Sequence, residues 1–121
     1  TDFGFFSDGL SPEECSPLSG CLVHCSEVES VDITGNEICD RGIQTMVSDA
    51  LQTSKIRYLQ ARYNKIADDG CDSLAELVRK NTTLQSLDLS NNSIGDKGMI
   101  VLASALHANS DLHTLNLCQN L

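Results

Sequence analysis

The chain has 121 residues, with 17 acidic against eight basic side chains and a formal net charge of −9. An acidic balance of this size argues against nucleic acid or an anionic membrane as the main partner. No run of residues approaches the apolar length of a membrane span, and the first residues lack the basic-then-apolar layout of a signal peptide.

Apolar residues recur along the chain with a period of 28. In the clearest copy, leucines and an isoleucine share a fixed spacing with one asparagine: Leu84, Leu87, Leu89, Asn92 and Ile94. The same frame begins again at Val28, Ile56 and Leu112, with only Ala61 undersized. The period predicts one continuous domain built from the repeats 28–55, 56–83 and 84–111 and a truncated repeat, 112–121.

Residues 1–27 fit the same frame weakly. Counting back 28 residues from Val31, Ile33 and Ile38 gives Phe3, Phe5 and Leu10. Glu14 replaces the glycine of the later copies, and Pro12 suits the first turn of a helix. We interpret 1–27 as a degenerate N-terminal repeat whose strand, near Phe3–Phe5, pairs with residues 31–33. The alternative interpretation is an irregular N-terminal arm.

Within each repeat, a period-two pattern predicts a short strand, and apolar spacings of three and four residues then predict a helix. We expect strands near 30–34, 58–62, 86–90 and 114–118, with helices near 40–52, 68–80 and 96–108. Asp40, Asp68 and Asp96 stand just before the helix glycines, where a carboxylate can cap free helix N–H groups. The asparagine after each strand is expected to bond the backbone of the adjacent loop: Asn36, Asn64, Asn92 and Asn120.

Strands joined through helices require a parallel sheet with right-handed crossovers. Parallel strands stack about 4.8 Å apart, whereas helix axes need about 8–10 Å, so the stack must bend with its strands inside. The expected fold class is α/β: a right-handed solenoid shaped as a horseshoe arc, with strands on the concave side and helices on the convex side.

The segment LDLSNNSIGDKGMIVLASAL resembles the ribonuclease-inhibitor-type leucine-rich repeats. That subfamily also occurs in the sensor regions of NOD-like receptors and in the Ran GTPase-activating protein. The resemblance covers 28–121 well and 1–27 weakly. It implies the solenoid fold but no single function, because these relatives differ in partner. The active-site region of the GTPase-activating protein matches no position here, so no catalytic residue is transferred.

Six cysteines raise the question of disulfides or metal. Cys15 and Cys71 occupy a core position of the repeat and are interpreted as small hydrophobes. Cys21, His24 and Cys25 lie within one helical turn, but no second ligand pair follows at a zinc-site spacing. We therefore expect reduced thiols, a cytoplasmic protein, no metal and no cofactor. Cys118 is expected to face outward on the sheet.

Two classes of function remain. The first is a protein–protein interaction module that binds a protein partner through its concave sheet, as part of a longer array or a larger assembly. The second is a GTPase-activating or other regulatory enzyme-like role. The three histidines have no partner at a catalytic spacing and no Gly-rich phosphate loop is present, so we expect no enzyme and no catalytic residue.

The residues between the buried strand positions should face the cavity. Six of them are predicted to bind the partner: Tyr58, Gln60, Arg62, Asp32, Asp88 and Asn116. Tyr58 and Arg62 are the residue types that most often dominate interface energetics. Asp32 and Asp88 flank that strand on the neighbouring units, where they could pair with Arg62 when no partner is bound. The alternative interpretation is a surface tyrosine beside a salt-bridged arginine, worth about 0–1 kcal/mol.

Overall fold

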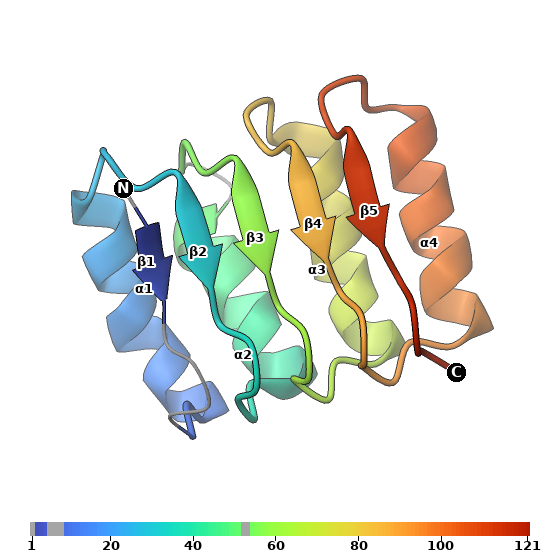
Figure 1. Ribbon diagram of the computed structural model, residues 1–121, viewed down its shortest axis with the longest axis horizontal. Coiled ribbons are helices and arrows are strands. Elements are labelled where there is room, and N and C mark those ends of the chain that lie inside the picture. The colour runs from blue at the N-terminus through green and yellow to red at the C-terminus, as the bar shows by residue number, and fades with distance from the viewer. Residues whose placement is uncertain (1, 5–8, 52–53) are drawn as a thin grey trace.

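The computed structural model describes residues 2–4, 9–51 and 54–121. There, one parallel sheet contains, in sequence order, β1 (Asp2–Gly4), β2 (Ser30–Asp32), β3 (Tyr58–Gln60), β4 (Ser86–Asp88) and β5 (Thr114–Asn116). Helices lie behind one face of the sheet: α1 (Cys15–His24), α2 (Cys39–Met46), α3 (Asp68–Lys80) and α4 (Asp96–His107) (Figure 1). A 3-10 turn (η1, Pro12–Glu14) precedes α1, and a π-helical turn (η2, Val47–Leu51) continues α2. The expected α/β class is confirmed.

The sheet register follows the repeat period. Val31 pairs with Leu59, and Leu59 pairs with Leu87, each 28 residues further along the chain. The strands are shorter than predicted, with three residues in each. After β2 the chain turns at Asp32, whose Oδ1 accepts from the N–H of Thr34 at 2.9 Å. Hydrogen bonds between neighbouring repeats nevertheless continue beyond the strands, as from Ile33 N to Gln60 O at 2.9 Å.

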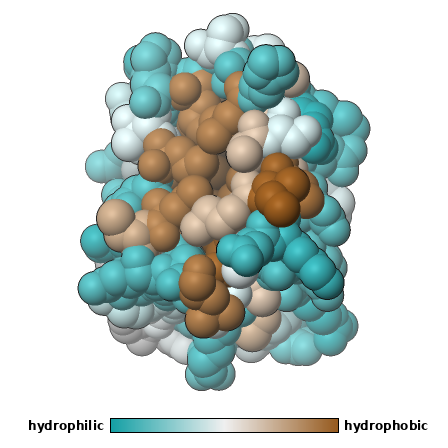
Figure 2. Space-filling model, turned by 90° about the vertical axis from the view of Figure 1, so that its right-hand side faces the viewer, coloured by the Kyte–Doolittle hydropathy of each residue, from teal (hydrophilic) through white to brown (hydrophobic). Residues whose placement is uncertain are grey.

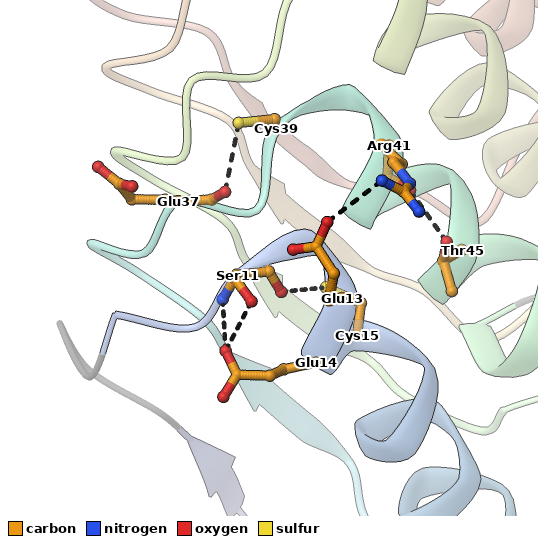
Figure 3. Close-up of polar contacts among 8 residues, drawn as sticks. All are labelled: Ser11, Glu13, Glu14, Cys15, Glu37, Cys39, Arg41 and Thr45. Atoms are coloured by element: carbon orange, nitrogen blue, oxygen red, sulfur yellow. Dashed lines mark hydrogen bonds and ion pairs between the residues drawn. The ribbon is translucent and has the colours of Figure 1, made fainter.

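Near the N-terminus, β1 lies where a strand was predicted, since Phe3 pairs with Val31. The orientation of the Phe3 side chain, and all of Phe5, lie outside the described residues. At the start of the helical segment, Glu14 Oε2 accepts from both the N–H and the hydroxyl of Ser11 at 2.8 Å (Figure 3). Arg41 on α2 reaches back to Glu13 at 3.2 Å, which links this repeat to the next.

The core lies between the sheet and the helices. Each strand contributes its inward residues, and Val31, Leu59 and Leu87 are all buried. The burial weakens in the last repeat, where Leu115 takes the equivalent position and is only half-buried. The end of the molecule formed by α4 and β5 accordingly shows a broad apolar patch (Figure 2).

The predicted asparagine ladder is confirmed. Asn92 Nδ2 donates to the carbonyls of Ala61 and Leu89 at 3.0 Å, and Asn92 Oδ1 accepts from the N–H groups of Asn64 and Ile66 at 3.0 Å. Asn120 repeats the pattern one unit later, donating to Leu89 O at 3.0 Å. One side chain in each unit thus satisfies backbone groups that the turn would leave buried without partners.

The aspartates before the helix glycines do not cap their own helices, so that prediction was wrong. Asp68 Oδ1 accepts from Gly95 N at 2.7 Å and Gly98 N at 3.0 Å, at the start of the next helix, α4. Asp40 Oδ1 likewise accepts from Ala67 N at 2.7 Å, at the start of α3. A stacked repeat brings its helix N-terminus against the preceding aspartate, so the carboxylate satisfies free N–H groups in the neighbour.

The helix glycines make this approach possible. A Cβ atom on Gly70 would lie 2.5 Å from Asp40 Oδ1 and 2.8 Å from Ile66 Cγ2. A Cβ atom on Gly98 would lie 2.7 Å from Asp68 Oδ1. These aspartate oxygens are held by hydrogen bonds and cannot move aside freely. The glycine is therefore required both by the aspartate of the preceding repeat and by the isoleucine four residues earlier in its own repeat.

Gly70→Ala should lower the free energy of unfolding by about 1–3 kcal/mol, because overpacking outweighs the better helix propensity of alanine. Gly20→Ala on α1 is the matched control, since a Cβ atom there would have no neighbour within 4 Å apart from the adjoining backbone of its own helix. That change should leave stability unchanged or raise it by about 1 kcal/mol. Urea denaturation of both variants measures the difference. Equal effects would contradict the interpretation of Gly70.

Two cysteines are confirmed as core residues. Burial raises the pKa of the Cys15 thiol to about 11 and that of Cys71 to about 12. The Cys71 thiol therefore stays protonated at pH 8, which makes it unreactive. Cys21, Cys25 and Cys118 are exposed, and Cys39 lies between the two groups.

A thiol reagent at pH 8 should label Cys21, Cys25 and Cys118 in the native chain and reach Cys15 and Cys71 only on unfolding. Mass spectrometry of digested, labelled protein identifies each site. We expect all six cysteines to label in urea above the unfolding midpoint. Rapid native labelling of Cys71 would show that the core between repeats opens locally.

Candidate protein-binding surface

The face of the sheet away from the helices presents three rows of side chains, which we call the concave face. The strand register gives the first two rows, Ser30, Tyr58, Ser86, Thr114 and Asp32, Gln60, Asp88, Asn116. The third row, just beyond the strands, has Thr34, Arg62, Ser90 and Cys118 at the same 28-residue spacing. Five of the six predicted site residues thus lie on β3 or level with its last residue, and Arg62 follows two residues later.

Tyr58 is the large exposed residue of the first row, with 41% of its surface accessible. Arg57, the residue before it, places its guanidinium 5.9 Å from the centre of the Tyr58 ring. Arg57 is itself held by a hydrogen bond from Nη2 to Gln85 Oε1 at 3.2 Å. A cation over one ring face favours this orientation of the exposed aromatic side chain.

Arg62 is half-buried and has no carboxylate partner among the described residues. Its Nε atom is buried without a hydrogen-bond partner there, and so is Oγ1 of Thr34, its equivalent one repeat earlier. The Nε end of the guanidinium is thus buried, and the charge has no ion pair among the described residues. Such a group gains from a partner that brings an acceptor or a negative charge.

The predicted pairing of Asp32 and Asp88 with Arg62 is not found. Asp32 is buried, and its Oδ1 bonds the N–H of Thr34 at 2.9 Å. Asp88 Oδ1 accepts from Ser90 N at 2.9 Å, and its Oδ2 accepts from Asn116 Nδ2 at 3.1 Å. Both carboxylates thus accept hydrogen bonds from the turn after their strand. Because neither forms an ion pair with Arg62, the interpretation of Arg62 as a salt-bridged arginine is wrong.

Asn116 and Gln60 complete the second row. Asn116 is fixed on both sides, because its Oδ1 also accepts from Cys118 N at 3.1 Å. Gln60 is half-buried between Asp32 and Asp88 in the strand register. The second row is therefore a largely prearranged polar strip, with Tyr58 of β3 on one side of it and Arg62, two residues beyond β3, on the other.

A charge pattern that sequence reasoning missed lies around the same strand. Four of the eight basic residues, Lys55, Arg57, Arg62 and Lys65, fall within eleven positions that contain no acidic residue. Lys65 is neutralised by Glu37 at 2.6 Å, and that contact holds the pKa of Glu37 below its usual value. Counting charges by repeat rather than over the whole chain reveals this basic segment in an acidic protein.

Other classes of site find little support among the described residues. No group of three or more His, Cys, Asp or Glu side chains is placed to hold a metal in that part of the chain. Nor does any helix described there have the length and apolar character needed to cross a membrane. A small pocket of about 120 Å³ lies between the first two repeats, lined mainly by apolar residues such as Leu22, Val28 and Ile56.

Comparison with known proteins agrees with this architecture. The family model described as Leucine Rich repeat matches residues 24–47 and 80–103. No curated protein matches the sequence significantly. Among solved structures, the chain is similar to one described as "Leiomodin-1 Actin-Binding Site 2 (ABS2)". The TM-score is 0.88 at 21% identity, and the match covers 97% of this chain and 69% of that chain. Two segments of the chain thus match leucine-rich repeats, and the fold is an α/β solenoid with one parallel sheet.

Proposed function

We propose that this protein is an interaction module that binds a protein partner through its concave face. Tyr58, Gln60 and Arg62 form the centre of the proposed contact, with Asp32, Asp88 and Asn116 beside them as a prearranged polar strip. One observation carries the proposal: Arg62 presents a charge without a carboxylate partner beside the exposed ring of Tyr58. Solenoids of this kind use their concave surfaces for partners.

The same geometry indicates the chemistry of the partner. A carboxylate or a main-chain carbonyl would satisfy the Arg62 guanidinium, and an apolar or aromatic side chain would cover the Tyr58 ring. Because Arg57 already orients that ring, little side-chain entropy is lost when the partner binds. Tyrosine and arginine in such positions commonly contribute more than 2 kcal/mol each, roughly, to an interface.

The wider setting of the module belongs to the same proposal. The uniform 28-residue period supports the ribonuclease-inhibitor-type subfamily, and we propose that the module is part of a longer array within a larger assembly. The free state of the six cysteines supports a reducing compartment, the cytoplasm.

A regulatory enzyme-like role is the alternative. Catalysis would need a nucleophile with a base, or paired acids in a pocket. On the concave face the two aspartates are engaged with turn amides instead, Asp32 with Thr34 and Asp88 with Ser90. GTPase-activation and nucleotidase assays on the isolated chain test this alternative, and we expect both to give the rate of the buffer control.

Replacing Tyr58 and Arg62 with alanine should abolish binding of the partner while leaving the fold intact. We expect each single change to weaken affinity by at least about tenfold, and the pair by more, since both groups sit at the centre of the contact. Quantitative affinity capture with the wild-type chain identifies the partner. Titration of that purified partner then measures each variant.

Ile100→Ser on α4 is the matched control, because this exposed residue lies on the helical side and carries no charge. It should bind the partner as the wild type does. Actin is the first protein to titrate, since the similar solved structure is described as an actin-binding site. Unchanged affinity of the Tyr58→Ala/Arg62→Ala variant would move the binding surface away from the concave face.

A further inference from the structure

Large side chains on the strand side of the molecule gather in one repeat, at β3 and in the turn after it. Three positions are enlarged there: Tyr58, Arg62 and Tyr63. The equivalent residues of the other repeats are smaller: Ser30, Ser86 and Thr114; Thr34, Ser90 and Cys118; Gly35, Asn91 and Gln119. Tyr63 lies just beyond the three rows of the concave face, and 56% of its surface is accessible.

The backbone at Tyr63 has a left-handed conformation that suits small residues. Its φ is 54°, and φ is similarly positive at the equivalent residues Gly35 (75°), Asn91 (56°) and Gln119 (57°). Glycine adopts this region without steric cost and asparagine at little cost, whereas a bulky side chain is strained there. The repeat frame by itself therefore favours glycine or asparagine at position 63.

The hydrogen bond that joins this turn to the next repeat is also longer at Tyr63. Tyr63 N lies 3.3 Å from Ser90 O. The corresponding distances are 2.9 Å from Gly35 N to Arg62 O and from Asn91 N to Cys118 O. The tyrosine thus occupies a conformation that it disfavours and closes its turn with a weaker bond than its equivalents do.

Interactions within the described residues do not account for this tyrosine. Its hydroxyl forms no hydrogen bond with another described residue, and the ring is not part of the hydrophobic core. Tyr58, in contrast, has the Arg57 guanidinium over its ring. Strained residues cluster at ligand-binding sites, where the surrounding fold supports a conformation that the side chain itself disfavours. An exposed, strained aromatic residue therefore points to a binding role.

The charges beside Tyr63 indicate what would bind there. Lys65, two residues later, is neutralised by Glu37 at 2.6 Å. Arg62, directly before Tyr63, has no ion pair among the described residues. Because Arg62 and Tyr63 are consecutive, one short segment of a partner can contact both. A carboxylate complements the guanidinium, and an apolar side chain complements the exposed ring.

We propose that Tyr63 is a further binding residue, and that the contact with the partner continues from the concave face onto the turn after β3. The partner segment carries a carboxylate that pairs with Arg62, next to an aromatic or aliphatic side chain that packs on the Tyr63 ring. This inference rests on the proposed function, since it extends the same contact. Residue 63 then lowers the stability of the free chain and strengthens binding.

The stability part is tested without a partner. Tyr63→Asn introduces the residue that the next repeat has at this position, and it should raise the urea midpoint by about 0.2–0.5 M as the strain is relieved. The reverse exchange, Asn91→Tyr, is the matched control and should lower the midpoint. A Tyr63→Asn chain no more stable than the wild type would give the tyrosine a structural role and overturn the proposal.

The binding part uses a random peptide library displayed on phage and selected on the wild-type chain. We expect the selected peptides to carry Asp or Glu beside an aromatic or aliphatic residue. Recovery of these clones on Tyr63→Asn should fall by at least about tenfold. Tyr63→Phe keeps the ring and should recover the clones as the wild type does.

The Tyr58→Ala/Arg62→Ala chain separates this inference from the proposed function. Clones lost on that chain but retained on Tyr63→Asn would contradict the role of Tyr63 and leave the concave-face contact standing. Clones lost only on Tyr63→Asn would place binding on the turn alone and contradict the concave-face contact. Selected peptides without acidic residues, or no enrichment on the wild type, would overturn the chemistry assigned to the partner segment.

Discussion

A carboxylate that crosses from one repeat to the next sets the geometry of this stack. Asp40 and Asp68 each satisfy the helix N-terminus of the following unit, and a glycine in that unit leaves room for the oxygen. A single repeat cannot complete its own helix terminus, its turn or its core. Stability therefore belongs to interfaces between units, as expected of a quasi-one-dimensional fold. The asparagine ladder also joins neighbouring repeats, since the Asn92 side chain bonds the backbone of Ala61 and Asn64 in the preceding unit.

The stacking of repeats also arranges the side chains of the concave face. Because the register advances by one repeat per strand, equivalent side chains form rows. In the second row, Asp32 and Asp88 bond the backbone of the turns that follow their strands. On this face, repeats then differ from one another mainly in a few large side chains that take no part in the core or in the turn hydrogen bonds. Tyr58, oriented by Arg57, and the uncompensated Arg62 are of this kind.

Much of the fold follows from the sequence because a 28-residue period constrains every copy at once. The helices, the parallel strands, the asparagines and the buried Cys15 and Cys71 were all predictable from position in the frame. The partners of the aspartates were not, because a pattern within one repeat does not show which helix lies within reach. The same gap produced the wrong pairing of Arg62 with Asp32 and Asp88. Arg57 was missed because the frame assigns it neither to the core nor to the cavity.

The account depends most directly on the carboxylate acting across the interface rather than within its own helix. Residue-resolved amide hydrogen exchange on the Asp68→Ala variant measures this. The interpretation predicts faster exchange at Gly95 and Gly98, which lose their acceptor, with the first turn of α3 unchanged. Faster exchange confined to the first turn of α3, with Gly95 and Gly98 as protected as before, would contradict it.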